Sequence, residues 1–282
     1  MTDNHAAPTI SALLRSAAHR LESLSETARL DAELLLAECL QRNRAYLYTW
    51  PEKIPDPATQ NKFDDLIDQR AEGIPVAYLT GTREFWSLPF RVNPETLIPR
   101  PETERLVELA LDILHQQEGP VLDLGTGSGA IAISLGSEFD ALVVDAVDQS
   151  AAALDIARFN AHTNKVNVHF IQSDWFEQVP RRDYRLIVAN PPYIAGDDPH
   201  LNRGGLQYEP RGALVSPKNG THDITCIVSG AAEFMQNSGW LLIEHGATQG
   251  TVTQQLMRDA GFQNVRTEQD IEARDRVTLG QR

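Results

Sequence analysis

Apolar residues recur at two different spacings along the chain, and the change divides the chain into two regions. In the N-terminal region they return every three or four positions, which is the spacing of one face of an α-helix. This spacing predicts four short helices and therefore a small helical domain over residues 1–81. The helices are marked by Ile10 to Leu24, Leu30 to Cys39, the residues after a cap at Asn43, and Phe63 to Ile67 before Gly73.

A different pattern begins after residue 81. Residues 83–93, REFWSLPFRVN, hold two short aromatic segments on either side of Ser-Leu-Pro. We predict a β-hairpin with its turn at Ser-Leu-Pro, inside a linker over residues 82–98. The following stretch, LIPRPETERLVELALDIL, predicts a helix with Pro101 in its first turn.

From Gly119 onward, strand-like apolar runs alternate with helical segments. This alternation gives βαβ units, so we predict an α/β domain over residues 99–282 with a mostly parallel sheet. The segment 195–220 is long and rich in Gly and Pro, and it predicts a loop on the substrate side of the sheet. The predicted strands are VLDL (121–124), ALVVDAV (141–147), VNVHFI (166–171), YRLIVA (184–189) and WLLIE (240–244), and the predicted helices lie near 129–138, 150–162, 222–236 and 247–260.

Charge and composition narrow the range of functions. The formal net charge of −14 disfavours a broad grip on nucleic-acid phosphates. Cys39 and Cys226 are far apart in the sequence, so neither a disulfide nor a metal site is expected. The first 25 residues carry charges among their apolar positions, and no apolar run approaches membrane-spanning length. We therefore expect a cytoplasmic protein without membrane contact.

The segment DLGTGSGAIAI, residues 123–133, follows a predicted strand and leads into a predicted helix. Glycines at alternate positions let the backbone approach a ligand closely, and the first N–H groups of the helix point toward that ligand. A nicotinamide fingerprint needs glycine where Ala130 stands, although alanine is tolerated there. We predict a cofactor-binding loop that comprises Gly125, Thr126, Gly127, Ser128 and Gly129.

Two further positions suit an adenosine-containing cofactor. An acidic residue at the end of the second strand is expected to hold a ribose, and Asp148 is better placed than Asp145 because it ends the apolar run just before a helix start at Ser150. A helix cap is the alternative role for Asp148, and both roles can coexist. After the third strand, Asp174 and Trp175 suit the polar edge and the flat face of an adenine, with a capped turn as the alternative.

Residues 188–194, VANPPYI, end the fourth strand at the edge where parallel sheets bind ligands. Proline has no N–H, so Asn190, Pro191 and Pro192 present oxygen atoms without competing donors. Such a site suits a planar NH₂ group, because two acceptors orient the nitrogen for attack without a strong general base. Tyr193 is expected to pack against the flat substrate group. A simple turn after a buried strand is the alternative.

DLGTGSG, AVDQS, SDWF and NPPY, in this order on one sheet, resemble class I S-adenosylmethionine-dependent methyltransferases with an amino-group acceptor. FRVNPETLIPRPETERLVELAL and YEPRGAL further resemble the HemK/PrmC family, which methylates the glutamine amide in the Gly-Gly-Gln loop of peptide-chain release factors. The resemblance covers essentially the whole chain, and LIPRPETE is its most distinctive part. It implies a Rossmann-like sheet with an antiparallel C-terminal hairpin strand, S-adenosyl-L-methionine as cofactor and S-adenosyl-L-homocysteine as product. It also implies a monomer that binds release factors and forms no stable complex with nucleic acid.

The resemblance assigns roles by position. It implies that residues 125–129 wrap the methionine and ribose end of the cofactor, that Asp148 holds the ribose hydroxyls and that Trp175 lies at the adenine. It implies that the N-terminal helices help to grip the release factor. The target glutamine is assigned to Asn190, Pro191, Pro192 and Tyr193, and Asn190 is also placed close to the cofactor. A structural role is favoured for Arg100, Glu102, Glu104 and Glu209.

Some features add little to this assignment. Glu244 and His245 are adjacent on a strand, so they point to opposite faces and should not form a joint ligand pair. His222 precedes Asp223 near a helix start and predicts a local cap pair. Ala273, in DIEARDR, stands where the family pattern has a glycine.

Other functions fit parts of the sequence. An adenine methyltransferase acting on DNA or RNA shares NPPY, but the net charge and the lack of a basic domain count against it. A nicotinamide oxidoreductase has no use for NPPY, and a non-catalytic module that binds release factors or ribosomes does not need an intact glycine loop. Methyl transfer to a protein glutamine is the leading hypothesis.

Overall fold

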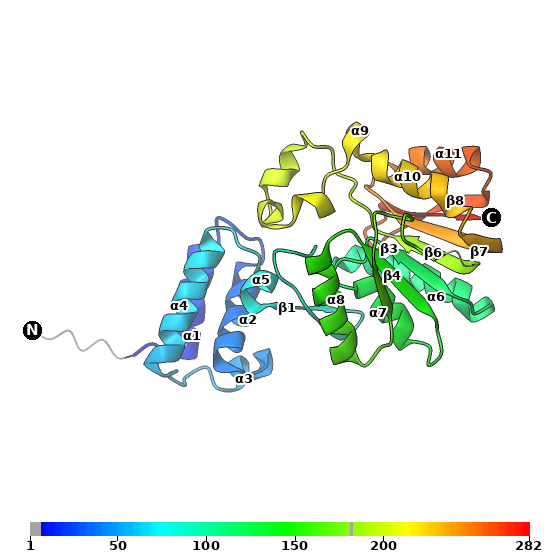
Figure 1. Ribbon diagram of the computed structural model, residues 1–282. Helices are drawn as coiled ribbons and strands as arrows, with labels where there is room; N and C mark the ends of the chain where they lie inside the picture. Colours follow the sequence, from blue (N-terminus) through cyan, green and yellow to red (C-terminus); the bar gives the residue numbers. More distant parts are fainter. Residues whose placement is uncertain (1–6, 181–182) are drawn as a thin grey trace, which may run out of the picture. The chain divides into compact units, whose positions relative to one another are not determined.

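The computed structural model describes residues 7–180 and 183–282 (Figure 1). The chain forms two compact units, one ending at Gly81 and one beginning at Thr82. The hairpin predicted as a linker belongs to the second unit. No helix in the described part of the chain is long and apolar enough to cross a membrane.

The first unit is helical, as its apolar spacing predicts. Asn43 caps the third helix, since its side chain accepts a hydrogen bond from the Tyr46 N–H. Leu35, Phe63 and Ile67 are fully buried in the common core. A fifth helix follows the four predicted ones. The helices are α1 (Ile10–Leu21), α2 (Ala28–Leu40), α3 (Arg44–Thr49), α4 (Pro57–Ala71) and α5 (Val76–Thr80).

The hairpin of the second unit pairs β1 (Thr82–Phe85) with β2 (Leu88–Arg91). Its turn is Trp86-Ser87, so the predicted Ser-Leu-Pro turn is wrong and Pro89 lies within β2 opposite Glu84. Trp86 and Ser87 both have positive φ, 52° and 57°, which is the conformation that a tight two-residue hairpin turn requires. Non-glycine residues rarely adopt it, so these residue types do not indicate the turn.

The main sheet has seven strands in the order β5-β4-β3-β6-β7-β9-β8, and β9 is antiparallel to its neighbours. This arrangement confirms the predicted Rossmann-like fold with an antiparallel C-terminal hairpin strand. The strand order reverses at β3, which is where such sheets bind their ligands. The strands are β3 (Val121–Leu124), β4 (Val144–Asp148), β5 (His169–Gln172), β6 (Tyr184–Ala189), β7 (Met235–Glu244), β8 (Gln263–Gln269) and β9 (Asp275–Gln281).

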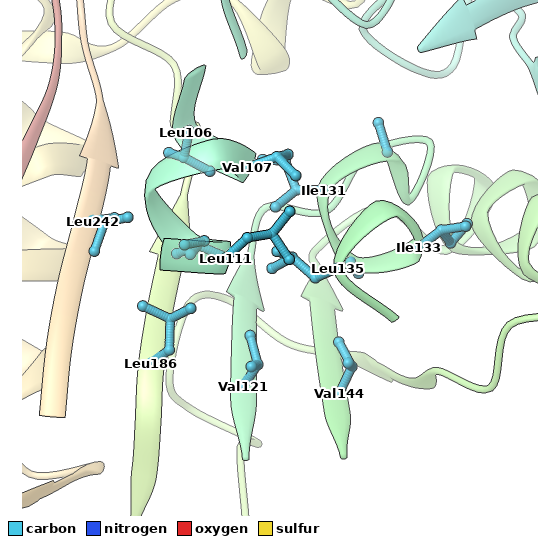
Figure 2. Close-up of a cluster of buried hydrophobic side chains, with 14 of the residues drawn as sticks. Leu106, Val107, Leu111, Val121, Ile131, Ile133, Leu135, Val144, Leu186 and Leu242 are labelled. Atoms are coloured by element: carbon cyan, nitrogen blue, oxygen red, sulfur yellow. The ribbon is translucent and has the colours of Figure 1, made fainter. Parts of the chain in front are cut away.

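Helices cover both faces of the sheet. On one face, α6 and α7 pack on alternate strand residues such as Val121 and Leu186 (Figure 2). On the other face, α10 and α11 cover the intervening residues such as Leu122 and Ile187. Both faces of β3 and β6 are therefore buried, which explains why their sequences are mostly apolar. The helices are α6 (Glu104–Gln116), α7 (Ala130–Ser137), α8 (Ala151–Asn164), α10 (His222–Ala231) and α11 (Gly250–Asp259).

The connection after β6 folds back beside the strand end. Ile194 and Val215 form an isolated parallel bridge, in which Ile194 N–H donates to Leu214 and Ser216 N–H donates to Ile194. This bridge holds the predicted long loop next to NPPYI. The short helices of this loop, with the one before α6, are η1 (Pro101–Thr103), η2 (Pro199–Asn202), η3 (Leu206–Tyr208), η4 (Arg211–Ala213) and α9 (Pro217–Gly220).

Candidate functional site

The carboxyl ends of β3, β4 and β6 open onto one cavity of about 520 Å³. Parallel strands bring their ends to the same edge, so motifs that are far apart in the sequence meet there. Residues from all four predicted motifs line this cavity. They include Gly125, Gly127, Asp148, Trp175, Asn190 and Pro192.

The glycine loop follows β3, and its three glycines have φ of +73°, +55° and +84°. A Cβ at Gly125 would lie 3.4 Å from the Trp175 ring, and one at Gly129 would lie 2.8 Å from Ile133. Gly125 and Gly127 line the cavity, whereas Gly129 is the N-cap of α7. The loop therefore needs glycine both for its backbone conformation and for close packing.

The polar residues of the loop point into the protein. Thr126 Oγ1 donates to Asp123 over 2.6 Å, and the Ser128 carbonyl accepts from the buried Asn160 amide over 2.9 Å. Burial raises the pKa of Asp123 to about 7. Sequence analysis missed both Asp123 and Asn160, whose hydrogen bonds hold the buried side of the loop in place. Asp123 lies inside the glycine motif, but nothing in the sequence marks Asn160.

Asp148 lies at the end of β4 and lines the cavity. Its carboxylate accepts from the Gly127 N–H and from the Ser150 N–H, both at 2.9 Å, and burial raises its pKa. Asp145, the other candidate, is buried away from the cavity and binds Tyr184 Oη at 2.6 Å. A carboxylate can accept further hydrogen bonds, so Asp148 fixes the loop and still presents acceptor capacity to a ligand.

Trp175 follows β5 in a tight turn and lines the cavity with Ser173 and Asp174. Its φ is +43°, a conformation that is uncommon for a bulky residue. The turn is held by the Ser173 hydroxyl, which donates to the Trp175 carbonyl over 2.9 Å and accepts from the Gln178 N–H over 2.9 Å. The strained backbone keeps the indole ring against Gly125.

Asn190 begins the NPPY motif and borders two cavities. Its Nδ2 donates to Thr103 Oγ1 over 3.2 Å, which leaves its Oδ1 available as an acceptor. Pro192 lines the large cavity, and Pro191 lines a smaller cavity of about 160 Å³ beside it. Asn190 therefore lies, with Leu97 and Ala213, where the two cavities meet.

Tyr193 lines the smaller cavity with Arg100 and Ile194. Its ring packs against the core beneath α10 and α11, and burial raises its pKa to about 12. Its carbonyl accepts from Gln249 Nε2 over 3.1 Å. Tyr193 therefore packs between the NPPY segment and the core, and it can contact a ligand only in the smaller cavity.

Glu209 and Glu104, for which a structural role was favoured, both anchor neighbouring segments. Glu209 is buried, forms an ion pair with Arg100 and accepts from the Ile98 N–H over 3.0 Å. It thereby ties the LIPRPETE segment to the loop after β6. Glu104 accepts from the Trp86 N–H over 2.9 Å and so fixes the hairpin turn.

The predicted cap pair at His222 is wrong. α10 begins after Thr221 without a side-chain cap, and His222 lines the large cavity with Asp223 and Cys226. His222 Nε2 lies 3.8 Å from Cys226 Sγ, one helical turn away. His222 and Cys226 are four residues apart in a predicted helix, and this spacing in the sequence indicates that both lie on the same helix face.

Glu244 and Thr103 are further residues that sequence analysis missed at the site. Glu244 and His245 contact different partners: His245 Nε2 lies 2.7 Å from Thr278 Oγ1, whereas Glu244 faces Thr103 and Asn190. No group of three or more His, Cys, Asp or Glu side chains arranged to hold a metal occurs among the residues that the structure describes.

The fold and the site together define a class I S-adenosylmethionine-dependent methyltransferase. The model of the PrmC N-terminal domain matches residues 12–81, and that of the methyltransferase small domain matches residues 104–203. The 16S rRNA methyltransferase of T. thermophilus, solved with AdoMet and guanosine, shares the fold with a TM-score of 0.54 at 18% identity, over 71% of this chain and 49% of that one.

Curated relatives define the family. The release factor glutamine methyltransferase of Vibrio cholerae is 48% identical over 97% of this chain and 96% of its own length. The release factor glutamine methyltransferase of Aliivibrio fischeri is 48% identical over 91% of each chain. The chain belongs to the family of release factor glutamine methyltransferases, which confirms the resemblance drawn from its motifs.

Proposed function

We propose that this protein transfers a methyl group from S-adenosyl-L-methionine to the side-chain amide nitrogen of the glutamine in the Gly-Gly-Gln motif of peptide-chain release factors. The names of its relatives support this substrate. The observation that carries the proposal is the set of oxygen acceptors at Asn190 to Pro192 beside the glycine loop. These acceptors suit an NH₂ group that lies next to the cofactor.

The cavity fits the cofactor. Gly125 and Gly127 leave open the space that side chains would fill, and Trp175 offers a flat apolar wall. We assign the methionine and ribose end to residues 125–129, the ribose hydroxyls to Asp148 and the adenine to Trp175. When bound, S-adenosylmethionine supplies an activated methyl group on a positively charged sulfur.

The residues that bind the substrate amide act by orienting its nitrogen. An amide nitrogen is a weak nucleophile because its lone pair is delocalised over the carbonyl. Asn190 Oδ1 and a carbonyl of the Pro191–Pro192 segment would accept its two N–H bonds and turn the nitrogen toward the cofactor side. The same oxygens stabilise the positive charge that develops on nitrogen. The proton leaves after methylation, so no strong general base is needed.

We also propose that residues 1–81 form the part that recognises the release factor, that residues 99–282 form the methyltransferase domain and that residues 82–98 connect them. The match to the PrmC N-terminal domain over residues 12–81 supports this division. We propose that the protein is a cytoplasmic monomer that makes no stable complex with nucleic acid. Its net charge of −14 supports the last point.

The test offers the purified protein radiolabelled S-adenosylmethionine with a bacterial release factor, duplex DNA or tRNA in separate reactions. We expect label in the release factor alone, at the Gly-Gly-Gln glutamine as located by peptide mass spectrometry. A release factor whose glutamine is replaced by alanine is the matched control and should stay unlabelled. Label in nucleic acid but not in the release factor would contradict the proposal.

A further inference from the structure

Asn190 and Glu244 occupy neighbouring positions at the ends of two adjacent strands. Ala189 of β6 pairs with Ile243 of β7 in parallel register, so the next residue on each strand stands side by side at the carboxyl edge. Ala189 and Ile243 face α10 and α11. Side chains alternate along a strand, so Asn190 and Glu244 both face the α6 side.

Thr103 meets these two side chains from η1. It is 4% exposed, and its Oγ1 accepts the Asn190 Nδ2–H. Glu244 is 1% exposed, and hydrogen bonding from the side chains of Thr103 and Asn190 acts on its carboxyl group. Glu244 Oε2 has no hydrogen-bond partner among the described residues. A carboxylate is thus buried beneath the acceptor site with spare capacity to accept hydrogen bonds.

An asparagine amide can present either its oxygen or its NH₂ group to a cavity. Only the oxygen can accept an N–H from a substrate amide. A carboxylate on one side of the amide attracts the NH₂ group and repels the oxygen, so it selects one of the two orientations. The Glu244 carboxylate can select the orientation in which the NH₂ group of Asn190 points toward it. The Thr103 hydroxyl alone selects this orientation less strongly, because it is neutral and can also donate a hydrogen bond to the amide oxygen.

We propose that Glu244 and Thr103 are positioning residues that hold the NH₂ group of Asn190 toward the α6 side, so that Asn190 Oδ1 faces the substrate. This inference rests on the proposed methyl transfer to an amide. Glu244 does not line the large cavity but is hydrogen-bonded with Asn190, so its effect on the reaction passes through Asn190.

The proposal has a consequence for pH dependence. The pKa of Glu244 is raised to about 7, mainly by burial and to a smaller extent by Glu102 on η1. Hydrogen bonds from Thr103 and Asn190 and the charge of Arg276 on β9 oppose the rise. Tyr193 also faces this group. Below the pKa, Glu244 gains an O–H that can donate to Asn190 Oδ1 and favour the unproductive orientation. The turnover number should therefore fall as the pH drops through about 7.

The test compares Glu244→Gln, Thr103→Val and the conservative Thr103→Ser with the wild type, using a bacterial release factor as substrate and saturating cofactor. Glutamine keeps the shape of Glu244 but carries a donor. Saturating cofactor separates this effect from that of Asp123 beside the cofactor loop, because burial raises the pKa of Asp123 to about 7 as well. Readouts are kcat and KM for the release factor, the Kd of the cofactor and the melting temperature.

We expect Glu244→Gln and Thr103→Val to lower kcat by at least about tenfold, while the cofactor Kd stays within about threefold, because the lost contact orients only the acceptor. Thr103→Ser should restore most of the rate. The fall in kcat below pH 7 should be present in the wild type and absent in Glu244→Gln.

A Glu244→Gln variant with wild-type kcat, or with the same pH profile as the wild type, would overturn the proposal. If that variant does not fold, the pair Thr103→Val and Thr103→Ser decides, and equal rates for both overturn the proposal. A wild-type protein that fails to methylate the release factor would instead refute the proposed function, so the two failures are distinguishable.

Discussion

Asn190 carries more of the expected chemistry than any other single residue. It borders both cavities, it directly follows β6, and its NH₂ group donates a hydrogen bond to Thr103. Removing its side chain deletes one of the acceptors that orient the substrate amide. The glycine loop and Asp148 do not depend on it for their hydrogen bonds.

We therefore expect Asn190→Ala to lower kcat by at least about a hundredfold, the scale of losing a well-placed polar contact at a reacting centre. Cofactor affinity should stay within about tenfold, since most of its binding surface is intact. Steady-state kinetics and isothermal titration calorimetry measure the two effects. Asn237→Ala, at an exposed position, is the control. Near-normal turnover of Asn190→Ala would mean that NPPY is only a turn after β6 and does not orient the substrate.

Ala273 is a second residue whose conformation leads to a prediction. It lies in the turn between β8 and β9 with φ of +58°, which L-residues other than glycine adopt at a cost. Asp270 organises this turn by accepting from the N–H groups of Glu272 and Arg274. The departure from the family's glycine, noted from the sequence, thus falls on a left-handed position.

Ala273→Gly should stabilise the protein by about 0.5–1 kcal/mol, because relief of the strain exceeds the added entropy of glycine in the unfolded chain. Ala18→Gly, in the right-handed interior of α1, is the control and should destabilise it by about 1 kcal/mol. Urea denaturation followed by circular dichroism measures both changes. If Ala273→Gly destabilised the protein as Ala18→Gly does, the left-handed strain at this position would be negligible.

At the scale of elements, the glycine loop is the part of the site that depends most on backbone shape. Gly127 has φ of +55° and lines the cavity, and a Cβ there would meet no protein atom within 4 Å. That Cβ would instead project toward the space assigned to the cofactor. A methyl group at this position therefore tests the site without disturbing the core.

Gly127→Ala should weaken cofactor binding by at least about fivefold, since the backbone strain and the lost space add about 1–2 kcal/mol. Gly261→Ala is the matched control, because Gly261 also has positive φ and no atom near its Cβ but lies outside the cavity. It should lose stability while keeping the cofactor Kd. Equal Kd values for both variants would place the cofactor elsewhere.

The elements were predicted best where burial alone decides them. β3 and β6 match their predicted bounds because both faces are buried and their sequences are mostly apolar. β4 begins later than predicted because Val143, counted as part of the run, is half-exposed. β7 begins earlier than WLLIE, through polar residues and Ser238 at φ of +66°, where its register with β6 shifts. Such irregular pairing has no signature in a single sequence.

The residues of the site also divide into those that the sequence predicts and those that it does not. Gly125, Asp148 and Asn190 were predictable because each stands at a strand end with a residue type that its chemistry requires. The roles of Thr103 and Glu244 depend on the register between β6 and β7 and on the placement of η1, which no local pattern reveals. Contacts between distant segments are therefore what the structure adds.

At the scale of the whole molecule, an exposed aromatic cluster on the first unit leads to a prediction. The net charge of −14 makes the protein acidic as a whole. Within the first unit, however, Lys53 Nζ lies 4.5 Å from the centroid of Trp50 and 5.2 Å from that of Tyr46. Trp50 and Ile54 are 43% and 55% exposed, so this cluster combines a cation with exposed apolar surface. Exposed aromatic residues beside a cation are typical of protein contacts.

If residues 1–81 recognise the release factor as proposed, Trp50→Ala should raise the KM for the release factor at least about fivefold, as loss of an aromatic contact of about 1 kcal/mol or more requires. The turnover number and the cofactor Kd should stay at wild-type values, because Trp50 belongs to neither cavity. Ile271→Ala, at a 95% exposed position of the second unit, controls for the loss of apolar surface. A Trp50→Ala variant that folds normally and keeps its KM would move recognition to another surface of the protein.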